Sequence, residues 1–239
     1  MQSVMIIKNV KVFTEDKTFE PGAIGIENGI FKNNLFDSGE IIDGEGCYAI
    51  PGLIDVHFHG CMGYDFCDGT KEAIEKIAEY EASQGVTTIV PATMTLSEEE
   101  LMKIMANGGT YENKEGAAVL AGINMEGPFI CSKKKGAQAA THIHKPDVAM
   151  FRRLQEAANG LIRLVDIAPE VEGAMKFISE LKDEVHISFA HTTADYDTAK
   201  TGYALGACHA THLYNAMPPF THREPGVIGA ARDLSLIHI

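Results

Sequence analysis

Two histidines one residue apart are the first candidates for chemistry in this sequence. His57 and His59 end the stretch PGLIDVHFHG at residues 51–60, where a Pro-Gly turn precedes a short apolar run. Side chains two apart on a strand point the same way, so a strand here would present both imidazoles together. Neighbouring ring nitrogens are good metal ligands, although a pair of hydrogen-bonded loop histidines is the alternative.

One carboxylate and two further histidines are expected to join this pair. Glu126, His191 and His212 each stand at or near the end of a predicted strand. Taken singly, Glu126 could cap its loop and His191 could be a hydrogen-bonded core residue. In a parallel barrel, however, the carboxyl ends of all strands open on one face. Four imidazoles and a carboxylate on that face predict a divalent-metal site with one ion or two, and such ligands suit zinc, iron, manganese and cobalt alike.

Alternating strands and helices must position these groups. Residues 1–50 are turn-rich and β-leaning, with strands expected at 4–7 and 10–13 and turns at Pro21-Gly22 and Asn28-Gly29. They predict part of a small β-sandwich domain. Beyond them the sequence predicts strands at 53–59, 87–94, 118–126, 161–167, 185–191 and 207–213, with helices at 71–84, 97–106, 146–158, 171–182 and 195–205. Thr70 should cap the first helix, Ser97 and Glu100 should form a capping box at the second, and Gly108-Gly109 should end the second. Six such units predict an α/β fold, a TIM-type (β/α)8 barrel that is incomplete over residues 51–233. A doubly wound open sheet is the alternative, but no nucleotide-binding glycine motif supports one.

Charge and composition exclude several classes of partner. The chain has 239 residues, 45% of them hydrophobic, and a net charge of −13, which argues against a surface for nucleic acid or an anionic membrane. A small anionic substrate is still compatible, because a local Arg outweighs the global field. The 5 cysteines include no C-x-x-C pair, so free thiols are expected. No stretch approaches the ~18 apolar residues of a membrane span. We therefore expect a cytoplasmic protein without nucleic-acid or membrane partners.

Five further motifs carry a resemblance to a known family. They are EGPFI at 126–130, KKGAQ at 134–138, FAHTTA at 189–194, ATHLYNAM at 210–217 and HREPG at 222–226. With PGLIDVHFHG, which resembles the first-strand signature of the amidohydrolase superfamily, they resemble the N-acetylglucosamine-6-phosphate deacetylase family from residue 10 to about 232. The resemblance implies hydrolysis of the acetamide of N-acetylglucosamine 6-phosphate to glucosamine 6-phosphate and acetate, in amino-sugar catabolism. It also suggests a homodimer.

The resemblance assigns a role to each metal candidate. Glu126, His191 and His212 match the principal metal ligands of the family. His57 and His59 match the second-metal ligands of those members that bind two ions, so this chain resembles the binuclear kind.

The same resemblance implies a site for a phosphorylated amino sugar. Asn215 and the backbone of Ala216 match positions that hold the phosphate, and Arg223 matches its cationic partner. Gln138 falls where many members carry a histidine facing the sugar, and its amide can still donate and accept hydrogen bonds.

Family members run well over a hundred residues further than this chain. We therefore expect residues 1–239 to lack two barrel strands and the Asp that serves the superfamily as general acid/base, and to be poorly soluble and inactive alone. Residues 234–239, LSLIHI, resemble a non-native tail. Two alternatives stay open: another amidohydrolase (dihydroorotase-like or an N-acyl amino acid deacetylase), and a non-catalytic protein that binds metal or sugar phosphate.

Overall fold

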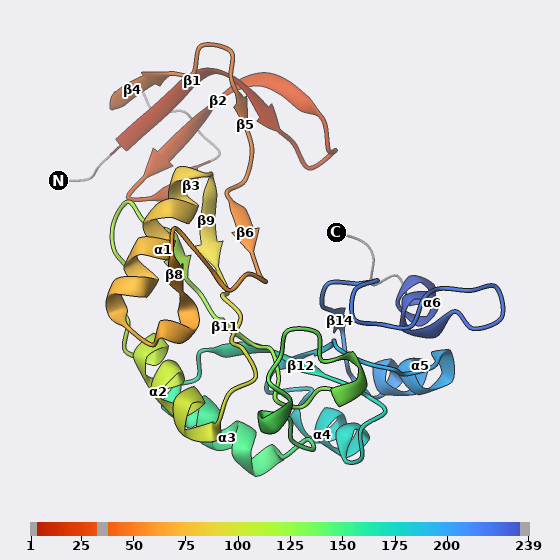
Figure 1. The fold of residues 1–239 in the computed structure, drawn as a ribbon. Coiled ribbons are helices and arrows are strands. Elements are labelled where there is room, and N and C mark those ends of the chain that lie inside the picture. The colour runs from red at the N-terminus through yellow and green to blue at the C-terminus, as the bar shows by residue number, and fades with distance from the viewer. Residues whose placement is uncertain (1–3, 33–37, 235–239) are drawn as a thin grey trace. The chain divides into compact units, whose positions relative to one another are not determined.

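The structure is a computed structural model that describes residues 4–32 and 38–234 (Figure 1). The tail predicted at 234–239 lies outside the described residues, apart from Leu234. The chain divides into two compact units, one ending at Gly52 and the other beginning at Leu53.

The first unit is a five-stranded sheet. Its strands are β1 (Val4–Phe13), β2 (Phe19–Glu27), β3 (Ile30–Lys32), β4 (Glu40–Asp43) and β5 (Tyr48–Ala49). The order is β3-β2-β1-β4, and β5 also pairs with β1. The two strands expected at 4–7 and 10–13 form one strand, whose pairing register shifts between Ile7 and Val10.

One of the two turns predicted in this unit is confirmed and the other is wrong. Asn28 and Gly29 turn the chain between β2 and β3, both with positive φ (51° and 76°), as a tight hairpin requires. Pro21, expected in a turn, instead lies inside β2 opposite Lys11. The pairing of β3 reaches only residues 25–27 of β2, so Pro21 stands at a sheet edge, where a missing N–H is tolerated.

The second unit carries parallel strands in chain order. These are β6 (Leu53–Asp55), β9 (Val86–Ile89), β10 (Val119–Leu120), β11 (Ile123–Met125), β12 (Ile162–Ile167), β13 (His186–Phe189) and β14 (His209–Ala210). They form the runs β6-β9-β10 and β11-β12-β13-β14, and a bridge between Ala92 and Asn124 joins the two runs. This is the strand order of a TIM-type barrel, as predicted, and within the described residues β6 and β14 are its edges.

Helices connect these strands and line one side of them in Figure 1. They are α1 (Lys71–Ser83), α2 (Glu98–Gly109), α3 (Val148–Ala157), α4 (Ala174–Leu181), α5 (Tyr196–Leu205) and α6 (Gly226–Asp233). Short 3-10 turns η1 (Phe66–Asp68), η2 (Ser132–Lys134) and η3 (Ala140–His142), and the hairpin β7–β8 (Gly60–Cys61 and Tyr64–Asp65), lie in the loops. The hairpin and α6 were not anticipated from the sequence.

Side-chain caps set the beginnings of four helices. Thr70 caps α1, and Ser97 forms the predicted capping box with Glu100 at α2. The Asp147 carboxylate accepts from the backbone N–H groups of Ala149 and Met150, so α3 begins after Pro146 rather than at it. Asp195 caps α5 in the same way.

The glycines expected to stop α2 are part of it. A Cβ on Gly109 would lie 2.5 Å from the backbone carbon of Ala158, and one on Gly108 would lie 2.9 Å from Ile123. These glycines therefore serve close packing against neighbouring backbone and side chain, and not helix termination.

The strands are shorter than predicted, and the reason is local. The strand expected at 53–59 ends at Asp55, whose carboxylate accepts from the backbone N–H of His57 at 3.0 Å. His191 and His212 have φ of 46° and 35°, a left-handed conformation that cannot continue a strand. All four candidate histidines therefore lie just beyond strand ends.

The core beneath them is apolar and rich in phenylalanine. Phe129, Phe151 and Phe177 are at most 1% exposed. The ring centroid of Phe177 lies 5.2 Å from that of Phe129 and 5.8 Å from that of Phe151. Among the described helices none is long and apolar enough to cross a membrane.

Candidate metal centre

Glu126 is the centre on which the candidate histidines converge. It follows β11 directly and its side chain is 2% exposed. Its Oε1 lies 2.8 Å from Nε2 of His191, 3.3 Å from Nε2 of His212 and 3.8 Å from Nε2 of His57. Its Oε2 lies 3.0 Å from Nε2 of His59. The structure thus brings together all five residues predicted as metal ligands.

Backbone oxygens hold three of the imidazoles by their other nitrogen. His59 Nδ1 lies 3.2 Å from the backbone oxygen of Ala92, and His191 Nδ1 lies 2.8 Å from that of Lys134. His212 Nδ1 lies 3.0 Å from the backbone oxygen of Asn215. A carbonyl only accepts, so Nδ1 must donate in each ring. In the neutral tautomer that this fixes, the lone pair of each Nε2 points to the centre.

Asn124 is a partner of His57 that the sequence analysis missed. Its amide nitrogen lies 3.0 Å from Nδ1 of His57, while its Oδ1 is buried without a hydrogen bond. The same nitrogen donates to the Val56 oxygen at 3.3 Å, so the amide connects the backbone of the turn after β6 with the imidazole of His57. Asn124 stands two residues before Glu126, so strand alternation could have revealed that both side chains face the same way.

The donor set fits a divalent cation. The ligand atoms of His57, Glu126 and His212 lie within 4.8 Å of one another. Nε2 of His212 and Nε2 of His191 are 3.1 Å apart, although both rings present lone pairs. Oε2 of Glu126 is buried and, despite its closeness to His59, has no hydrogen bond of adequate geometry. A cation among these atoms would satisfy all of them.

The electrostatics of the centre favour an ionised Glu126 and a neutral His57, whereas Glu126 raises the pKa of His59 and, against burial, that of His212. Burial by itself raises the pKa of Glu126, but the close imidazoles of His191, His212 and His59 outweigh burial and hold the pKa far below its usual range. Burial also lowers the pKa of His57. Near neutral pH the centre therefore contains a carboxylate and, at His57, a neutral imidazole.

The loop after β14 carries two of the predicted phosphate-binding residues. Asn215 donates its backbone N–H to the His212 oxygen at 2.8 Å, and the Ala216 oxygen accepts from the Thr192 N–H at 3.1 Å. His212, Tyr214 and Ala216 all have positive φ. Positive φ at three residues out of five makes this loop turn sharply just beyond the ligand candidate His212.

The other two predicted substrate-binding residues are Arg223 and Gln138. Arg223 is exposed and lines a cavity of about 480 Å³ that also contains Thr193, two residues from His191. Gln138 is 3% exposed, and its Oε1 accepts from the Thr95 N–H at 2.6 Å. Its predicted contact with the sugar therefore has only the amide nitrogen left to make it.

Gly127 lets the loop of Glu126 pack against the loop of Thr95. Its φ is 77°, and a Cβ there would lie 2.0 Å from Thr95 Oγ1. Gly127→Ala should therefore lower the free energy of unfolding by about 2–3 kcal/mol, because the left-handed backbone alone costs an L-residue about 1–2 kcal/mol. Gly116→Ala is the control, since Gly116 has a φ of 81° with open space around it. Urea unfolding of both variants measures the difference, and equal losses would contradict the close approach.

A buried polar chain lies beneath the centre. Thr211 donates to Asp166 Oδ1 at 2.6 Å, Ser188 Oγ lies 2.7 Å from Thr211 Oγ1, and His209 Nδ1 lies 3.0 Å from Ser188 Oγ. Asp166 is fully buried and its Oδ2 has no hydrogen bond. Sequence reasoning missed this chain, although an acid inside the apolar strand LIRLVDIA was a usable signal.

Asp166 should make stability fall with rising pH. Burial raises its pKa to about 7, against the hydrogen bond from Thr211. The folded protein holds this proton more tightly than the unfolded chain, so the contribution of Asp166 to the free energy of unfolding is fully present below about pH 4. This contribution falls as pH rises toward 7, by up to about 1.4 kcal/mol per pH unit. Asp166→Asn should lack this loss, so its stability relative to wild type should rise between pH 5 and pH 7.5. Chemical unfolding of metal-free protein tests this, and parallel pH profiles would contradict it.

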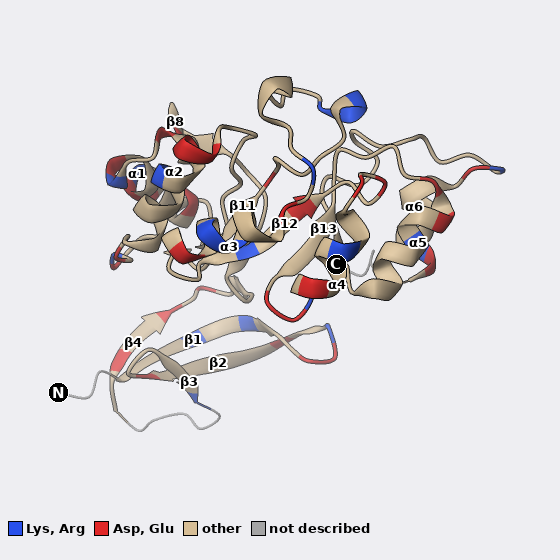
Figure 2. Cartoon of the chain, turned by 90° about the horizontal axis from the view of Figure 1, so that it is seen from below, with Lys and Arg blue, Asp and Glu red and all other residues tan. Residues whose placement is uncertain are grey.

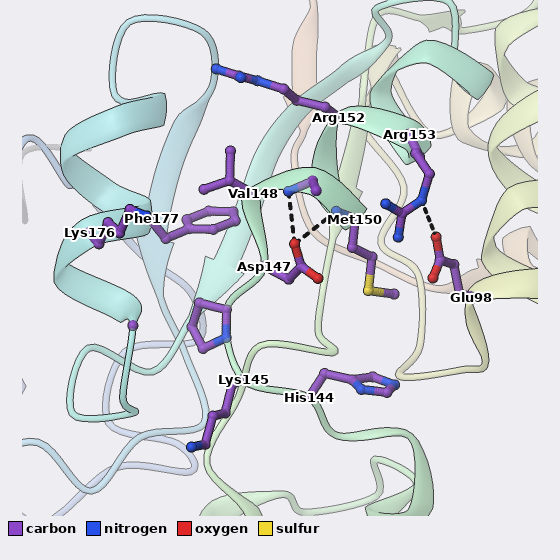
Figure 3. A pocket seen from close by; sticks show the side chains of 13 residues that line it. Glu98, His144, Lys145, Asp147, Val148, Met150, Arg152, Arg153, Lys176 and Phe177 are labelled. Atoms are coloured by element: carbon purple, nitrogen blue, oxygen red, sulfur yellow. Dashed lines mark hydrogen bonds and ion pairs between the residues drawn. The ribbon is translucent and has the colours of Figure 1, made fainter.

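A larger cavity, of about 940 Å³, lies away from the centre between α3 and α4 (Figure 3). Its charged groups are already engaged: Arg153 bonds Glu98 at 2.7 Å, Arg152 bonds Glu184 at 2.8 Å, and Lys145 pairs with Glu172. Figure 2 shows acidic and basic residues interspersed over α2 and α3 in the same manner. Exposed pairs of this kind indicate a solvated outer face rather than a binding site.

Comparison with known proteins identifies the family. The model of the Amidohydrolase family matches residues 48–238. The chain belongs to the amidohydrolase family. Enzymes of this family use divalent metals, in agreement with the histidine–glutamate cluster of the structure.

The relatives of this amidohydrolase are named as deacetylases of phosphorylated amino sugars. It is 35% identical to an N-acetylglucosamine-6-phosphate deacetylase of Bacillus subtilis (strain 168), over 97% of this chain and 61% of the relative. It is 26% identical to an N-acetylgalactosamine-6-phosphate deacetylase of Escherichia coli O157:H7, over 94% of this chain and 60% of the relative. The chain thus spans about 60% of the length of these relatives.

A solved structure extends the similarity to three dimensions. A variant of N-acetyl-D-glucosamine-6-phosphate deacetylase from Mycobacterium smegmatis, in complex with N-acetyl-D-glucosamine-6-phosphate, superposes with a TM-score of 0.86 at 27% identity. The match covers 99% of this chain and 62% of that one.

Proposed function

We propose that the complete protein hydrolyses the acetamide of N-acetylglucosamine 6-phosphate, giving glucosamine 6-phosphate and acetate. The observation that carries the proposal is the convergence of four imidazoles on the buried carboxylate of Glu126. The names of the relatives and the bound sugar phosphate of the superposed structure support the substrate. The proposal includes one or two ions of zinc, iron, manganese or cobalt, a cytoplasmic location and a homodimer.

The residues of the centre divide the work between them. A divalent ion there supplies Lewis acidity toward an amide carbonyl and lowers the pKa of bound water. Glu126 contributes the negative charge, and His191 and His212 contribute lone pairs in a tautomer fixed by backbone carbonyls. His57 and His59 serve a second ion.

Groups on the loop after β14 would hold the phosphate end of the substrate. The side chain of Asn215 and the backbone of Ala216 would contact the phosphate, since the N–H of Asn215 is bonded to the His212 oxygen. Arg223, exposed on the same loop, supplies a planar cation whose geometry matches a phosphate. Gln138 contributes its amide nitrogen toward the sugar.

Acetate release by the metal-loaded, complete protein tests this proposal. N-acetylglucosamine 6-phosphate should be hydrolysed far faster than unphosphorylated N-acetylglucosamine, with N-acetylgalactosamine 6-phosphate as the epimer control. A preference for the galactose epimer would transfer the assignment to the chemistry named for the Escherichia coli relative. Hydrolysis of dihydroorotate or of an N-acyl amino acid, with none of the sugar phosphates, would refute it in favour of another amidohydrolase. Metal binding without any hydrolysis would favour a non-catalytic binder.

A further inference from the structure

Glu170 binds the turn that follows the metal-ligand candidate His191. It lies just beyond β12 and is half-buried. Its Oε2 accepts from Thr192 Oγ1 at 2.5 Å, and its Oε1 accepts from the Thr193 N–H at 2.5 Å and from Thr193 Oγ1 at 2.9 Å. One carboxylate therefore accepts three hydrogen bonds from two consecutive residues, and bonds to an ionised acceptor are stronger than neutral ones.

His191 needs such support because its backbone is strained. A φ of 46° costs a histidine about 1–2 kcal/mol relative to ordinary conformations, and surrounding structure must impose it. The conformation also decides the direction of the ring, whose Nε2 makes the shortest contact with Glu126, 2.8 Å. A shift of this turn would therefore move a metal ligand.

Several segments hold the same turn from other directions. The Cys131 N–H donates to the His191 oxygen at 2.9 Å, and the Thr192 N–H donates to the Ala216 oxygen at 3.1 Å. Lys134 accepts from the ring with its carbonyl and donates its ammonium to the Met217 oxygen at 3.1 Å. Within this network Glu170 supplies the anionic side chain that grips residues 192 and 193.

Thr192 connects this grip to the next helix. It is fully buried, and its Oγ1 accepts from the Ala194 N–H at 2.9 Å while it donates to Glu170. Asp195, the next residue, caps α5. Glu170 is thus bonded to the residues on both the ligand side and the helix side of this turn.

We propose that Glu170 is a positioning residue of the metal centre, which holds the turn at residues 191–193 so that His191 Nε2 faces Glu126. The inference rests on the proposed function only in requiring that the centre bind a metal. It predicts that metal affinity depends on Glu170, a residue that itself contacts no ion.

Affinity for Zn²⁺ and Co²⁺, measured by competition with a chromophoric chelator, tests the proposal. Glu170→Ala should weaken binding by about 10–100-fold, the usual effect of removing a group that orients a ligand. Glu170→Gln should retain most of the affinity, because its oxygen can still accept from Thr193 and its amide can donate to Thr192. Glu172→Ala is the matched control: Glu172 is two residues away, exposed, and paired with Lys145. The visible spectrum of the Co²⁺-loaded protein should change in Glu170→Ala alone.

The outcomes separate this inference from the proposed function. Wild-type protein that binds no metal would overturn both. Wild-type binding with equal affinity in Glu170→Ala would overturn only the positioning role, and so would a lower melting temperature at unchanged affinity. If Glu170→Ala does not fold, Thr192→Val and Thr193→Ala each remove one hydroxyl donor. Affinity weakened in both supports the role, and affinity unchanged in both overturns it.

Discussion

Replacing Glu126 by Ala should strip the protein of metal. The variant removes the sole carboxylate among the five ligand candidates and leaves four imidazoles around a buried space. We expect affinity for Zn²⁺ to fall by more than about 100-fold, and amide hydrolysis by the complete protein to fall by several decades. Metal content after dialysis, measured by mass spectrometry, checks the first part without reference to activity.

One variant inside the centre and one outside it control this result. His59→Ala should remove only the second ion, because Glu126 still meets His191 and His212. Glu98→Ala removes an exposed carboxylate of a surface ion pair and should leave metal content unchanged. Undiminished metal in Glu126→Ala would show that the ion binds elsewhere.

Arg223→Ala should weaken recognition of phosphate selectively. The loss of a charge-assisted pair with an anion costs about 2–3 kcal/mol, which corresponds to an increase of about 30–150-fold in KM for N-acetylglucosamine 6-phosphate. KM for unphosphorylated N-acetylglucosamine should stay within about twofold, because that substrate offers the guanidinium no anion. Steady-state acetate release with both substrates measures the two values.

Arg152 offers a matched control for this experiment. It is an exposed arginine of α3 that pairs with Glu184 in the turn after α4, and Arg152→Ala should change neither KM. Equal losses on both substrates in Arg223→Ala would mean that Arg223 supports the loop and does not bind phosphate.

The order of the strands was predictable because it depends on patterns that persist along the chain. Alternating apolar runs and capped helices indicated parallel β/α units, and Thr70 and Ser97 cap the helices that they were expected to cap. Strand ends were less predictable. They depend on side-chain-to-backbone bonds such as Asp55 to His57, and on left-handed residues such as His191, neither of which a hydrophobic pattern reports.

The convergence of the five ligand candidates was predictable from residue type and strand position, but the residues that contact them were not. Glu170 and Asn124 act through contacts between different strand ends, and only the fold brings such residues together. The hydrogen-bond partner of Gln138 was also not predictable from the sequence. Its residue type suited a sugar contact, yet its carbonyl oxygen is bonded to the backbone of Thr95 in a neighbouring loop.

The most direct test of the metal centre is anomalous diffraction from crystals grown with Zn²⁺ or Co²⁺, recorded on both sides of the metal absorption edge. We expect a peak about 2.0–2.2 Å from the Glu126 carboxylate and from Nε2 of His191 and His212. A second, weaker peak beside His57 and His59 would correspond to the second ion. Absence of a peak at Glu126 in crystals saturated with metal, or a peak only at surface residues, would contradict the central claim.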